Sequence, residues 1–258
     1  MQTSESWTRS GAVVTTDKGL PIISIVVPAF NEAGRIGNSI KKIDAFIRQS
    51  QLSFEFIVVD DGSADNTAEI VRKSQVEGLR LVQNGRNRGK GYSVRQGVLA
   101  ASGKYVLFTD ADLSAPIEEL DKLLDVAMKE GVDIVIGSRA VDRKFIEKHQ
   151  APFRELGGTL FNSMVRFILG LQLHDTQCGF KLFSRQRSRR IFELQRTSGF
   201  GFDPELLFIA KRHGLTIRET PVRWSHAEGS KVNFLRDGIR MLIDLAQIRW
   251  NGMIGRYR

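Results

Sequence analysis

The sequence predicts an α/β fold in which a mostly parallel sheet is flanked by helices. Two observations carry this prediction. Strand-length apolar runs alternate with helical stretches through the first half of the chain, and the runs are apolar at successive positions rather than at every second one. Strands that are apolar on both sides are typical of a parallel sheet covered on both faces. The 258 residues suit one such domain with additions.

The expected elements of the first half follow one another with short connections. Strands are expected at residues 22–27, 54–59, 79–83, 105–109 and 133–136, and helices at residues 32–48, 65–74, 91–101 and 117–130. The first helix repeats an apolar residue at near-helical spacing, with Ile36, Ile40, Ile43 and Ile47. In sheets of this kind ligands bind beyond the carboxyl ends of the strands.

The second half is expected to elaborate the same domain. A broad apolar stretch, a polar loop entering a short strand, a helix, an extended segment and a further helix are expected at residues 153–171, 175–183, 203–212, 216–222 and 233–250. The last helix sets apolar residues against arginines, as in a helix at a membrane interface, although core packing explains such a stripe equally well. We expect a flexible arm at residues 1–20, the main domain at 21–232, and an amphipathic basic helix and tail at 233–258.

Charge and cysteine content narrow the functional classes. A net charge of +9 suits nucleic acid, anionic lipid or a phosphorylated substrate, or else a merely solvated basic face. The single cysteine, Cys178, excludes an internal disulfide and fits a reducing compartment. Residues 1–20 lack the apolar core of a signal peptide, and no apolar run reaches the roughly 18 residues of a membrane-spanning helix.

The fourth expected strand ends in two acids one residue apart. In an extended chain, side chains two residues apart lie on one face, so Asp110 and Asp112 can point at one ligand. Two close carboxylates repel each other unless a cation neutralises them, and a hard divalent ion is the usual one. The alternative is a capped turn before the following helix.

Polar residues also follow the first three strands, at residues 28–32, 60–63 and 87–91. A carboxylate at Asp60 can accept hydrogen bonds from a base N–H or from ribose hydroxyls, whereas Ser63 or Asp65 can cap the next helix. The glycines at 87–91 let the backbone approach an anion at a helix N-terminus, although the P-loop spacing is absent and a solvated turn is equally consistent. Because these strand ends meet at one edge of the sheet, we expect one shared site.

Four motifs occur in order: VVPAFNE (Val26–Glu32), DDGSADNT (Asp60–Thr67), NRGKG (Asn87–Gly91) and DAD (Asp110–Asp112). Together they resemble the motifs of family 2 glycosyltransferases, which are inverting enzymes of the Rossmann-like GT-A fold. Within that family, Gly137–Arg139 and Asp175–Lys181 resemble the dolichyl-phosphate β-glucosyltransferase branch, close to the polyprenyl-phosphate mannosyltransferases. Residues 202–205 and 224–232 extend this likeness.

The resemblance implies a role for each matched position. The nucleotide-sugar site would include Pro28, Asn31, Glu32, Asp60, Lys90, Asp110, Ala111 and Gln177. Asp112 would bind a divalent metal, Mg²⁺ or Mn²⁺, on the donor pyrophosphate. Arg139 and Arg154 would face the acceptor phosphate, and Lys181, with Gln177, would frame the donor sugar or the acceptor. Mannosyltransferases of this group often carry Gln where this chain has Ser114, which leaves the third metal ligand open.

The expected reaction moves a hexose from a sugar nucleotide, UDP-glucose, to a polyprenyl or dolichyl phosphate at the cytoplasmic, anionic surface of a membrane. A lipid phosphate is already ionised near neutral pH and needs no strong base. If the acceptor were a saccharide hydroxyl, a base would be needed, and Asp203 would be the leading candidate. The nearest alternative donor is GDP-mannose. Nucleic acid is not an expected partner, because it explains neither the paired acids nor the ordered motifs.

Overall fold

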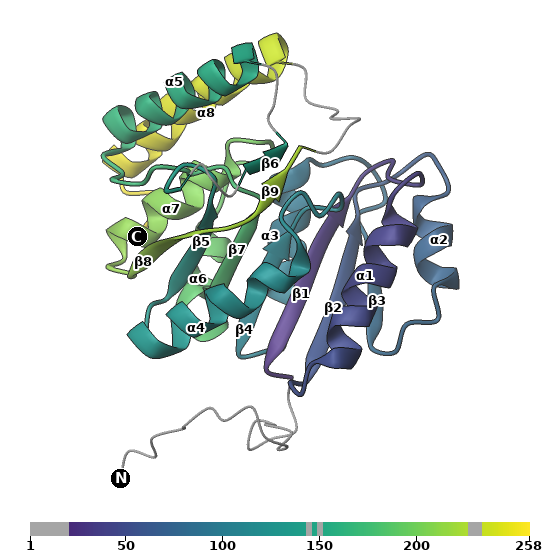
Figure 1. Ribbon diagram of the computed structural model, residues 1–258. Coiled ribbons are helices and arrows are strands. Elements are labelled where there is room, and N and C mark those ends of the chain that lie inside the picture. The colour runs from purple at the N-terminus through teal and green to yellow at the C-terminus, as the bar shows by residue number, and fades with distance from the viewer. Residues whose placement is uncertain (1–20, 143–145, 149–151, 227–233) are drawn as a thin grey trace.

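The strands and helices expected in the first half of the chain are all present. The computed structural model describes residues 21–142, 146–148, 152–226 and 234–258 (Figure 1). The first-half elements are β1 (Ile23–Ala29), α1 (Ile36–Gln49), β2 (Phe54–Asp60), α2 (Thr67–Lys73), β3 (Leu79–Gln83), α3 (Lys90–Ala100), β4 (Tyr105–Thr109), the 3-10 turn η1 (Ile117–Glu119), α4 (Leu120–Glu130) and β5 (Ile134–Ser138). The expected arm at residues 1–20 lies outside the described residues.

The second half contains two short strands and one helix that were not expected. Its elements are β6 (Ile146–Lys148), α5 (Pro152–Leu169), β7 (Phe180–Ser184), α6 (Arg185–Leu194), α7 (Phe202–Arg212), β8 (Ile217–Pro221), β9 (Trp224–Ser225) and α8 (Phe234–Met253). The unexpected helix is α6, whose many arginines hide its helical pattern. It still buries Ile191 and Phe192, which are both inaccessible to solvent.

The main sheet confirms the predicted α/β class and adds one antiparallel strand. Its seven strands lie in the order β3-β2-β1-β4-β7-β5-β8. Strand β7 runs antiparallel between β4 and β5, while the other neighbouring strands of this sheet are parallel. The register pairs Thr109 at the end of β4 with Phe180 at the start of β7. As a result, the loop before β7 lies beside the two acids that follow β4.

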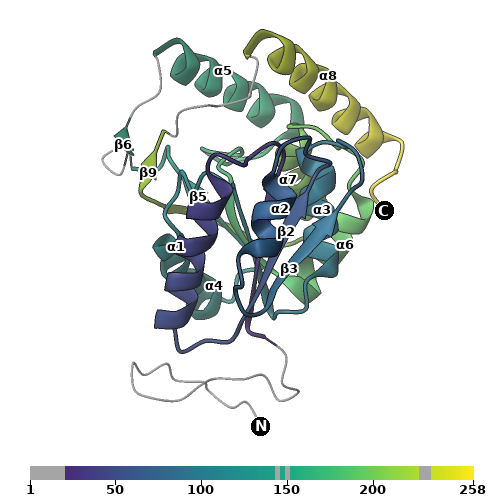
Figure 2. The same cartoon turned by 90° about the vertical axis from the view of Figure 1, so that its right-hand side faces the viewer.

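Helices cover both faces of this sheet and create two apolar cores. On one face α1 and α4 pack on strand residues such as Ile25 and Leu107. On the other face α3, α6 and α7 pack on strand residues such as Val26 and Phe108 (Figure 2). Because neighbouring residues of a strand point to opposite faces, the continuous apolar runs of the sequence are explained by this double cover.

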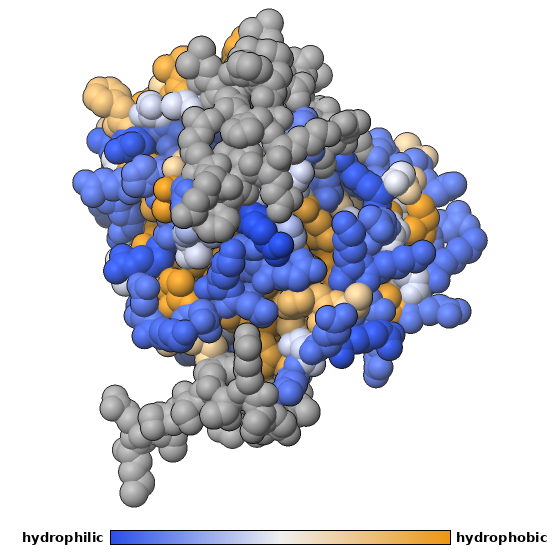
Figure 3. Space-filling view, viewed as in Figure 1, coloured by the Kyte–Doolittle hydropathy of each residue, from blue (hydrophilic) through white to orange (hydrophobic). Residues whose placement is uncertain are grey.

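Helices α5 and α8 pack against each other beyond the carboxyl ends of the parallel strands (Figure 1). Their inner residues are buried, including Val165 of α5 and Leu245 of α8. Other large apolar residues of the pair and of the turn after α8 point outward, and we call them the outer apolar residues: Leu160, Phe167, Ile239, Leu242, Ile243, Trp250, Met253 and Ile254. Figure 3 shows apolar side chains on this part of an otherwise mainly hydrophilic surface. Among the described residues, no helix is long and apolar enough to cross a membrane.

Candidate functional site

The two acids after β4 lie in a tight turn at the carboxyl edge of the sheet. The backbone N–H of Ser114 donates to Asp112 Oδ1 at 3.0 Å, and Leu113 between them has a positive φ of 49°. Burial, and then the negative charge of Asp110, raise the pKa of Asp112 above its ordinary value. The carboxylate of Asp112 is therefore placed where a nearby positive charge would stabilise it.

The carboxylate oxygens at this turn fit a hard divalent ion for which the protein supplies only some of the coordinating ligands. Among the described residues, no cluster of three or more His, Cys, Asp or Glu side chains is arranged to hold a metal. Asp112 supplies carboxylate oxygens in a partly buried turn, and Asp110 lies close enough to repel it. Mg²⁺ binds through one or two carboxylates and keeps waters and substrate phosphates as its other ligands. The residues present thus suit a divalent ion that takes most of its ligands from water or from a bound molecule.

Lys90 supplies positive charge next to these acids. Its Nζ lies 2.7 Å from Asp110 Oδ1. Burial disfavours the charged lysine, but the attraction of Asp110 and Asp203 outweighs it, so the pKa of Lys90 is raised and the group stays protonated. Lys90 is the first residue of α3, where the helix dipole also favours an anion.

Asp61 stabilises the conformation of the loop that leads into Lys90. Its carboxylate accepts hydrogen bonds from the backbone N–H groups of Arg88 and Gly89, at 3.0 and 2.8 Å, and from the Asn84 side chain at 2.7 Å. Gly89 has a φ of 101°, and a Cβ there would overlap the backbone oxygen of Ser198. The glycine is therefore required by close packing of two loops as well as by its backbone conformation. The sequence pattern pointed to Asp60 and left Asp61 unassigned.

The predicted nucleotide-binding residues line the neighbouring strand ends. Asp60 is buried, and its carboxylate accepts from Ser63 N at 3.2 Å and from Gln83 Nε2 at 3.3 Å. Asn31 has a φ of 53° and ties the two loops together, since its Oδ1 accepts from Ala64 N at 2.8 Å.

The remaining residues predicted for the nucleotide also lie at this edge. Pro28 is buried in β1 opposite Val59, and Ala111 accepts a hydrogen bond from Ser39 Oγ at 2.6 Å through its backbone oxygen. Glu32 is paired with Arg35. Attraction to Glu32, and then to Asp112 and Asp110, raises the pKa of Arg35 against the effect of burial. Arg35 was not among the predicted site residues, because its position after the first motif carries no distinctive pattern.

Lys181 and Asp203 form a buried ion pair beneath the acids. Lys181 Nζ donates to Asp203 Oδ1 and, at 2.6 Å, to the backbone oxygen of Cys178. The two side chains are 1% and 6% exposed. Burial raises the pKa of Asp203, while Lys181 and Lys90 oppose that effect. Both lysine Nζ atoms lie within 6 Å of the centre of the Phe108 ring, at 5.4 and 5.9 Å.

Arg139 is held in a fixed orientation by Asp175. Its Nε and Nη2 donate to the two carboxylate oxygens of Asp175 at 2.7 and 2.8 Å, and its backbone N–H donates to the same carboxylate at 3.0 Å. The guanidinium also lies over the ring of Trp224, with Cζ 5.4 Å from the ring centre. Burial disfavours the carboxylate, but Arg139 outweighs it and lowers the pKa of Asp175 to about 2. Asp175 was part of a recognised motif but was given no role.

The end of the loop before β7 lies next to Asp110 and Trp224. Cys178 and Gly179 of this loop line a narrow cleft with Asp110 and Trp224. A Cβ at Gly179 would overlap the carboxylate of Asp110, so only glycine permits this contact. Burial raises the pKa of the Cys178 thiol to about 12, which leaves it protonated and unreactive. The structure thus brings Asp110, Asp112, Lys90, Lys181, Asp203 and Arg139 into one region.

Two further predicted residues are Gln177, at the margin of that region, and Arg154, whose side chain the structure does not describe. Gln177 donates from its backbone N–H to Asp175 at 3.2 Å, and its Nε2 approaches Met241 Sδ of α8 at 3.9 Å. Arg154 belongs to α5, but its side chain is outside the described part of the structure.

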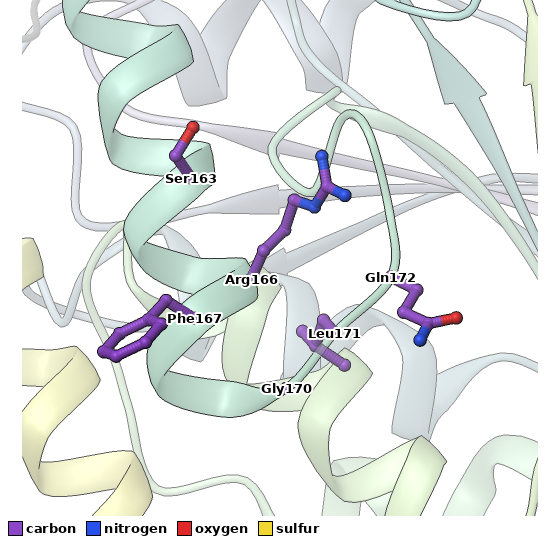
Figure 4. Close-up of a pocket in the computed structure, with 6 residues that line it drawn as sticks. All are labelled: Ser163, Arg166, Phe167, Gly170, Leu171 and Gln172. Carbon is purple, nitrogen blue, oxygen red and sulfur yellow. The ribbon is translucent and has the colours of Figure 1, made fainter.

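A more open hollow lies elsewhere, at the end of α5. It has a volume of about 400 Å³ and is lined by Ser163, Arg166, Phe167, Gly170, Leu171 and Gln172 (Figure 4). The Phe167 ring points away from the Arg166 guanidinium, and none of the lining residues is an acid. This hollow therefore lacks the paired carboxylates that distinguish the strand-end site.

Comparison with known proteins is consistent across sequence and structure. The model of the family described as Glycosyl transferase family 2 matches residues 24–192. The dolichyl-phosphate beta-glucosyltransferase of Saccharomyces cerevisiae is 37% identical over 257 residues, covering 92% of this chain and 76% of that protein. The protein of the same name from Homo sapiens is 32% identical over 255 residues, covering 92% and 77%.

Solved structures share the fold at lower identity. Mannosyl-3-phosphoglycerate synthase from Rubrobacter xylanophilus has a TM-score of 0.66 and 20% identity, covering 92% of this chain and 75% of that one. Glucosyl-3-phosphoglycerate synthase from Mycobacterium tuberculosis, in complex with Mn²⁺, UDP-glucose and phosphoglyceric acid, has a TM-score of 0.64 and 22% identity, covering 95% and 86%.

Proposed function

Since this chain belongs to glycosyl transferase family 2, we propose that it transfers glucose from UDP-glucose to a polyprenyl or dolichyl phosphate, with inversion at the anomeric carbon. One observation carries the choice of a phosphate acceptor. Arg139, which is charged at any physiological pH, is fixed near the paired acids of the donor side: its guanidinium lies over Trp224, which lines a narrow cleft together with Asp110. An arginine in that position suits an anionic acceptor better than a neutral saccharide.

The donor would occupy the carboxyl edge formed by β1, β2 and the start of α3. Asp60 offers a carboxylate for a base N–H or a ribose hydroxyl, and Lys90 offers a cation at the N-terminus of α3 for the diphosphate. Asp112 would hold a divalent ion, Mg²⁺ or Mn²⁺, which when bound stabilises the negative charge on the departing nucleoside diphosphate. The raised pKa of Asp112 supports this assignment, because a bound cation would relieve its repulsion from Asp110.

The acceptor phosphate needs orientation rather than deprotonation. Its oxygen is already ionised near neutral pH, so the chain has to hold two anions together against their repulsion. The guanidinium of Arg139, which Asp175 holds in a fixed orientation, is suited to bind one of these two anions. Lys181 and Asp203 would contribute as a buried ion pair, because the Lys181 Nζ already donates hydrogen bonds to Asp203 and to the Cys178 backbone oxygen. In this arrangement Asp203 shapes the site electrostatically and is not needed as a base.

A lipid acceptor also requires a surface that meets the bilayer. The outer apolar residues of α5 and α8 lie on the side of the molecule that carries the strand carboxyl ends, and Phe167 among them is 90% exposed. Arg240 and Arg249 lie exposed on α8 beside these residues. Anionic headgroups contribute roughly 1 kcal/mol for each nearby basic residue, which would add to apolar insertion. We therefore infer peripheral binding at an anionic membrane surface, expected on its cytoplasmic side.

The test is transfer of radiolabelled sugar from UDP-glucose and from GDP-mannose, in separate reactions, to polyprenyl phosphate in detergent with Mg²⁺ or Mn²⁺. Lipid-extractable label from UDP-glucose alone supports the proposal. Label from GDP-mannose alone would replace the donor and keep the acceptor. If a donor binds but no lipid product forms, the lipid acceptor is wrong, and a saccharide acceptor with Asp203 as base becomes the function to test.

A further inference from the structure

A loop formed by residues 195–199 packs directly against the start of α3, where Lys90 lies. The backbone oxygen of Ser198 accepts from Tyr92 N at 3.2 Å, and Gln195 Nε2 donates to Gly91 O at 2.9 Å. A Cβ on Gly89 would overlap the Ser198 oxygen, and one on Gly91 would lie 2.8 Å from the Thr197 oxygen. The loop therefore contacts the backbone on both sides of Lys90. It leaves no space into which the Gly89–Gly91 backbone could shift towards it.

Glu205, in the first turn of α7, holds this loop in place. The carboxylate accepts from Thr197 N at 2.8 Å and from Arg196 N at 3.1 and 3.2 Å, and the residue is fully buried. Hydrogen bonds from neutral donors to a buried charge are among the stronger ones in proteins. Glu205 therefore lies too deep to touch a substrate, but it is bonded to the loop that does touch the Lys90 segment.

The end of the chain completes this arrangement. Tyr257 is buried, and its hydroxyl donates to Glu205 Oε1 at 2.6 Å while its ring packs edge-on against Phe208 of α7. Burial and the nearby charge of Glu205 raise the pKa of Tyr257, so the hydroxyl remains a donor at neutral pH. A second contact joins α8 to the same region, because the Gly201 N–H donates to the Asp244 carboxylate.

We propose that Glu205, fixed by Tyr257, is a positioning residue for the donor: it holds the 195–199 loop against Gly89–Gly91 and thereby places the Lys90 ammonium. This inference rests on the proposed function, because the donor diphosphate is the group that Lys90 would meet. It assigns to Tyr257, which follows α8, an indirect part in donor binding through Glu205.

The experiment compares Tyr257→Phe and Glu205→Gln with a matched control, Tyr105→Phe. The control removes the same hydroxyl from a mostly buried tyrosine at the opposite end of β4 from Asp110. For Tyr257→Phe, we expect the Kd for UDP-glucose to rise about fivefold, which is about 1 kcal/mol. Glu205→Gln should weaken binding further, since it removes the charge that both loop N–H groups contact. The KM for the lipid acceptor should be unchanged in Tyr257→Phe.

A further measurement separates positioning from general destabilisation. Hydrogen exchange at the Tyr92 amide should accelerate in Tyr257→Phe and not in Tyr105→Phe. Equal UDP-glucose affinity in wild type, Tyr257→Phe and Glu205→Gln would overturn the inference, as would an equal loss in Tyr105→Phe. If wild type binds neither UDP-glucose nor GDP-mannose, the proposed function itself fails and the inference falls with it. Unchanged Tyr92 exchange in Tyr257→Phe would overturn the link between the tail and the loop, even where Glu205→Gln does not fold.

Discussion

Arg139 and Asp175 form a bidentate pair in which both carboxylate oxygens accept from one guanidinium, at 2.7 and 2.8 Å. Glu219 in turn fixes the backbone at Asp175, because its carboxylate accepts hydrogen bonds from the backbone N–H groups of His174 and Asp175, each at 2.8 Å. The orientation of Arg139 is thus determined by Asp175 directly and by Glu219 through the backbone at residues 174 and 175. A guanidinium fixed in this way can bind a phosphate without first losing side-chain freedom.

Replacing Asp175 with Asn should weaken acceptor use more than donor binding. The amide keeps the size of the side chain but loses the charge that orients Arg139, and hydrogen bonds to charged groups contribute about 1.5–3 kcal/mol. We expect the KM for polyprenyl phosphate to rise at least about tenfold. The Kd for UDP-glucose should stay close to that of wild type. A defect confined to the donor would contradict the placement of Arg139 at the acceptor.

The same pair predicts how stability depends on acid pH. Because the pKa of Asp175 is lowered from 3.8 to about 2 in the folded protein, its stabilising contribution is fully present above about pH 4 and is lost as the pH falls towards 2. That lowering corresponds to about 2 kcal/mol at neutral pH. Urea unfolding of wild type and Asp175→Asn should show a difference that shrinks between pH 4 and 2. A constant difference across this range would refute the assignment.

Replacing Asp112 with Asn should separate activity from stability. Burial and the Asp110 charge raise the pKa of Asp112, so the ionised group is disfavoured in the folded protein above its ordinary pKa. Without metal, the neutral amide should leave the thermal midpoint at pH 7 unchanged or higher. Transfer should fall about 100-fold or more, and Mn²⁺ binding measured by calorimetry with UDP present should weaken.

Asp125→Asn is the matched control for that variant, since Asp125 is exposed and pairs with Lys129 along its own helix. Its transfer rate should equal that of wild type. Full turnover of Asp112→Asn at saturating Mn²⁺ would show that Asp112 does not hold the metal.

Replacing Lys181 with Met should destabilise the fold, because it leaves Asp203 charged and buried. Breaking such a pair typically costs about 3–5 kcal/mol, measurable by urea unfolding. The double variant with Asp203→Leu should regain much of that loss, since no unpaired charge remains. Lys129→Met, which breaks an exposed pair, should cost less than about 1 kcal/mol. A stable Lys181→Met variant that loses only activity would assign Lys181 to direct substrate contact instead.

Substitutions on α8 should test the membrane surface. Ile243→Ser with Trp250→Ser removes two outer apolar residues that are 60% and 57% exposed. Sedimentation with vesicles should show weaker binding to both neutral and anionic lipid, with UDP-glucose binding unaffected. Arg240→Gln with Arg249→Gln should reduce only the preference for anionic vesicles. Unaltered vesicle binding in both variants would place the membrane contact elsewhere.

Local sequence patterns were sufficient to predict the alternating strands and helices and the edge of the sheet at which Asp110 and Asp112 lie. A strand buried on both faces must be apolar at each position, and a helix must repeat its apolar face, so both are visible in contiguous residues. Asp110 and Asp112 could be placed for the same reason, since they directly follow such a strand. The helix α6 was missed because its arginines mask the two buried residues that anchor it.

Only the tertiary structure decided which charges meet. Strand β7 runs antiparallel between β4 and β5, and this brings Lys181 of β7, and Asp175 in the loop before it, beside the acids. Arg139 and Asp175 are 36 residues apart, Lys181 and Asp203 are 22 apart, and Glu205 and Tyr257 are 52 apart. Each of these pairs depends on which elements become neighbours and how deeply they are buried, and neither property is encoded in the residues adjacent to them.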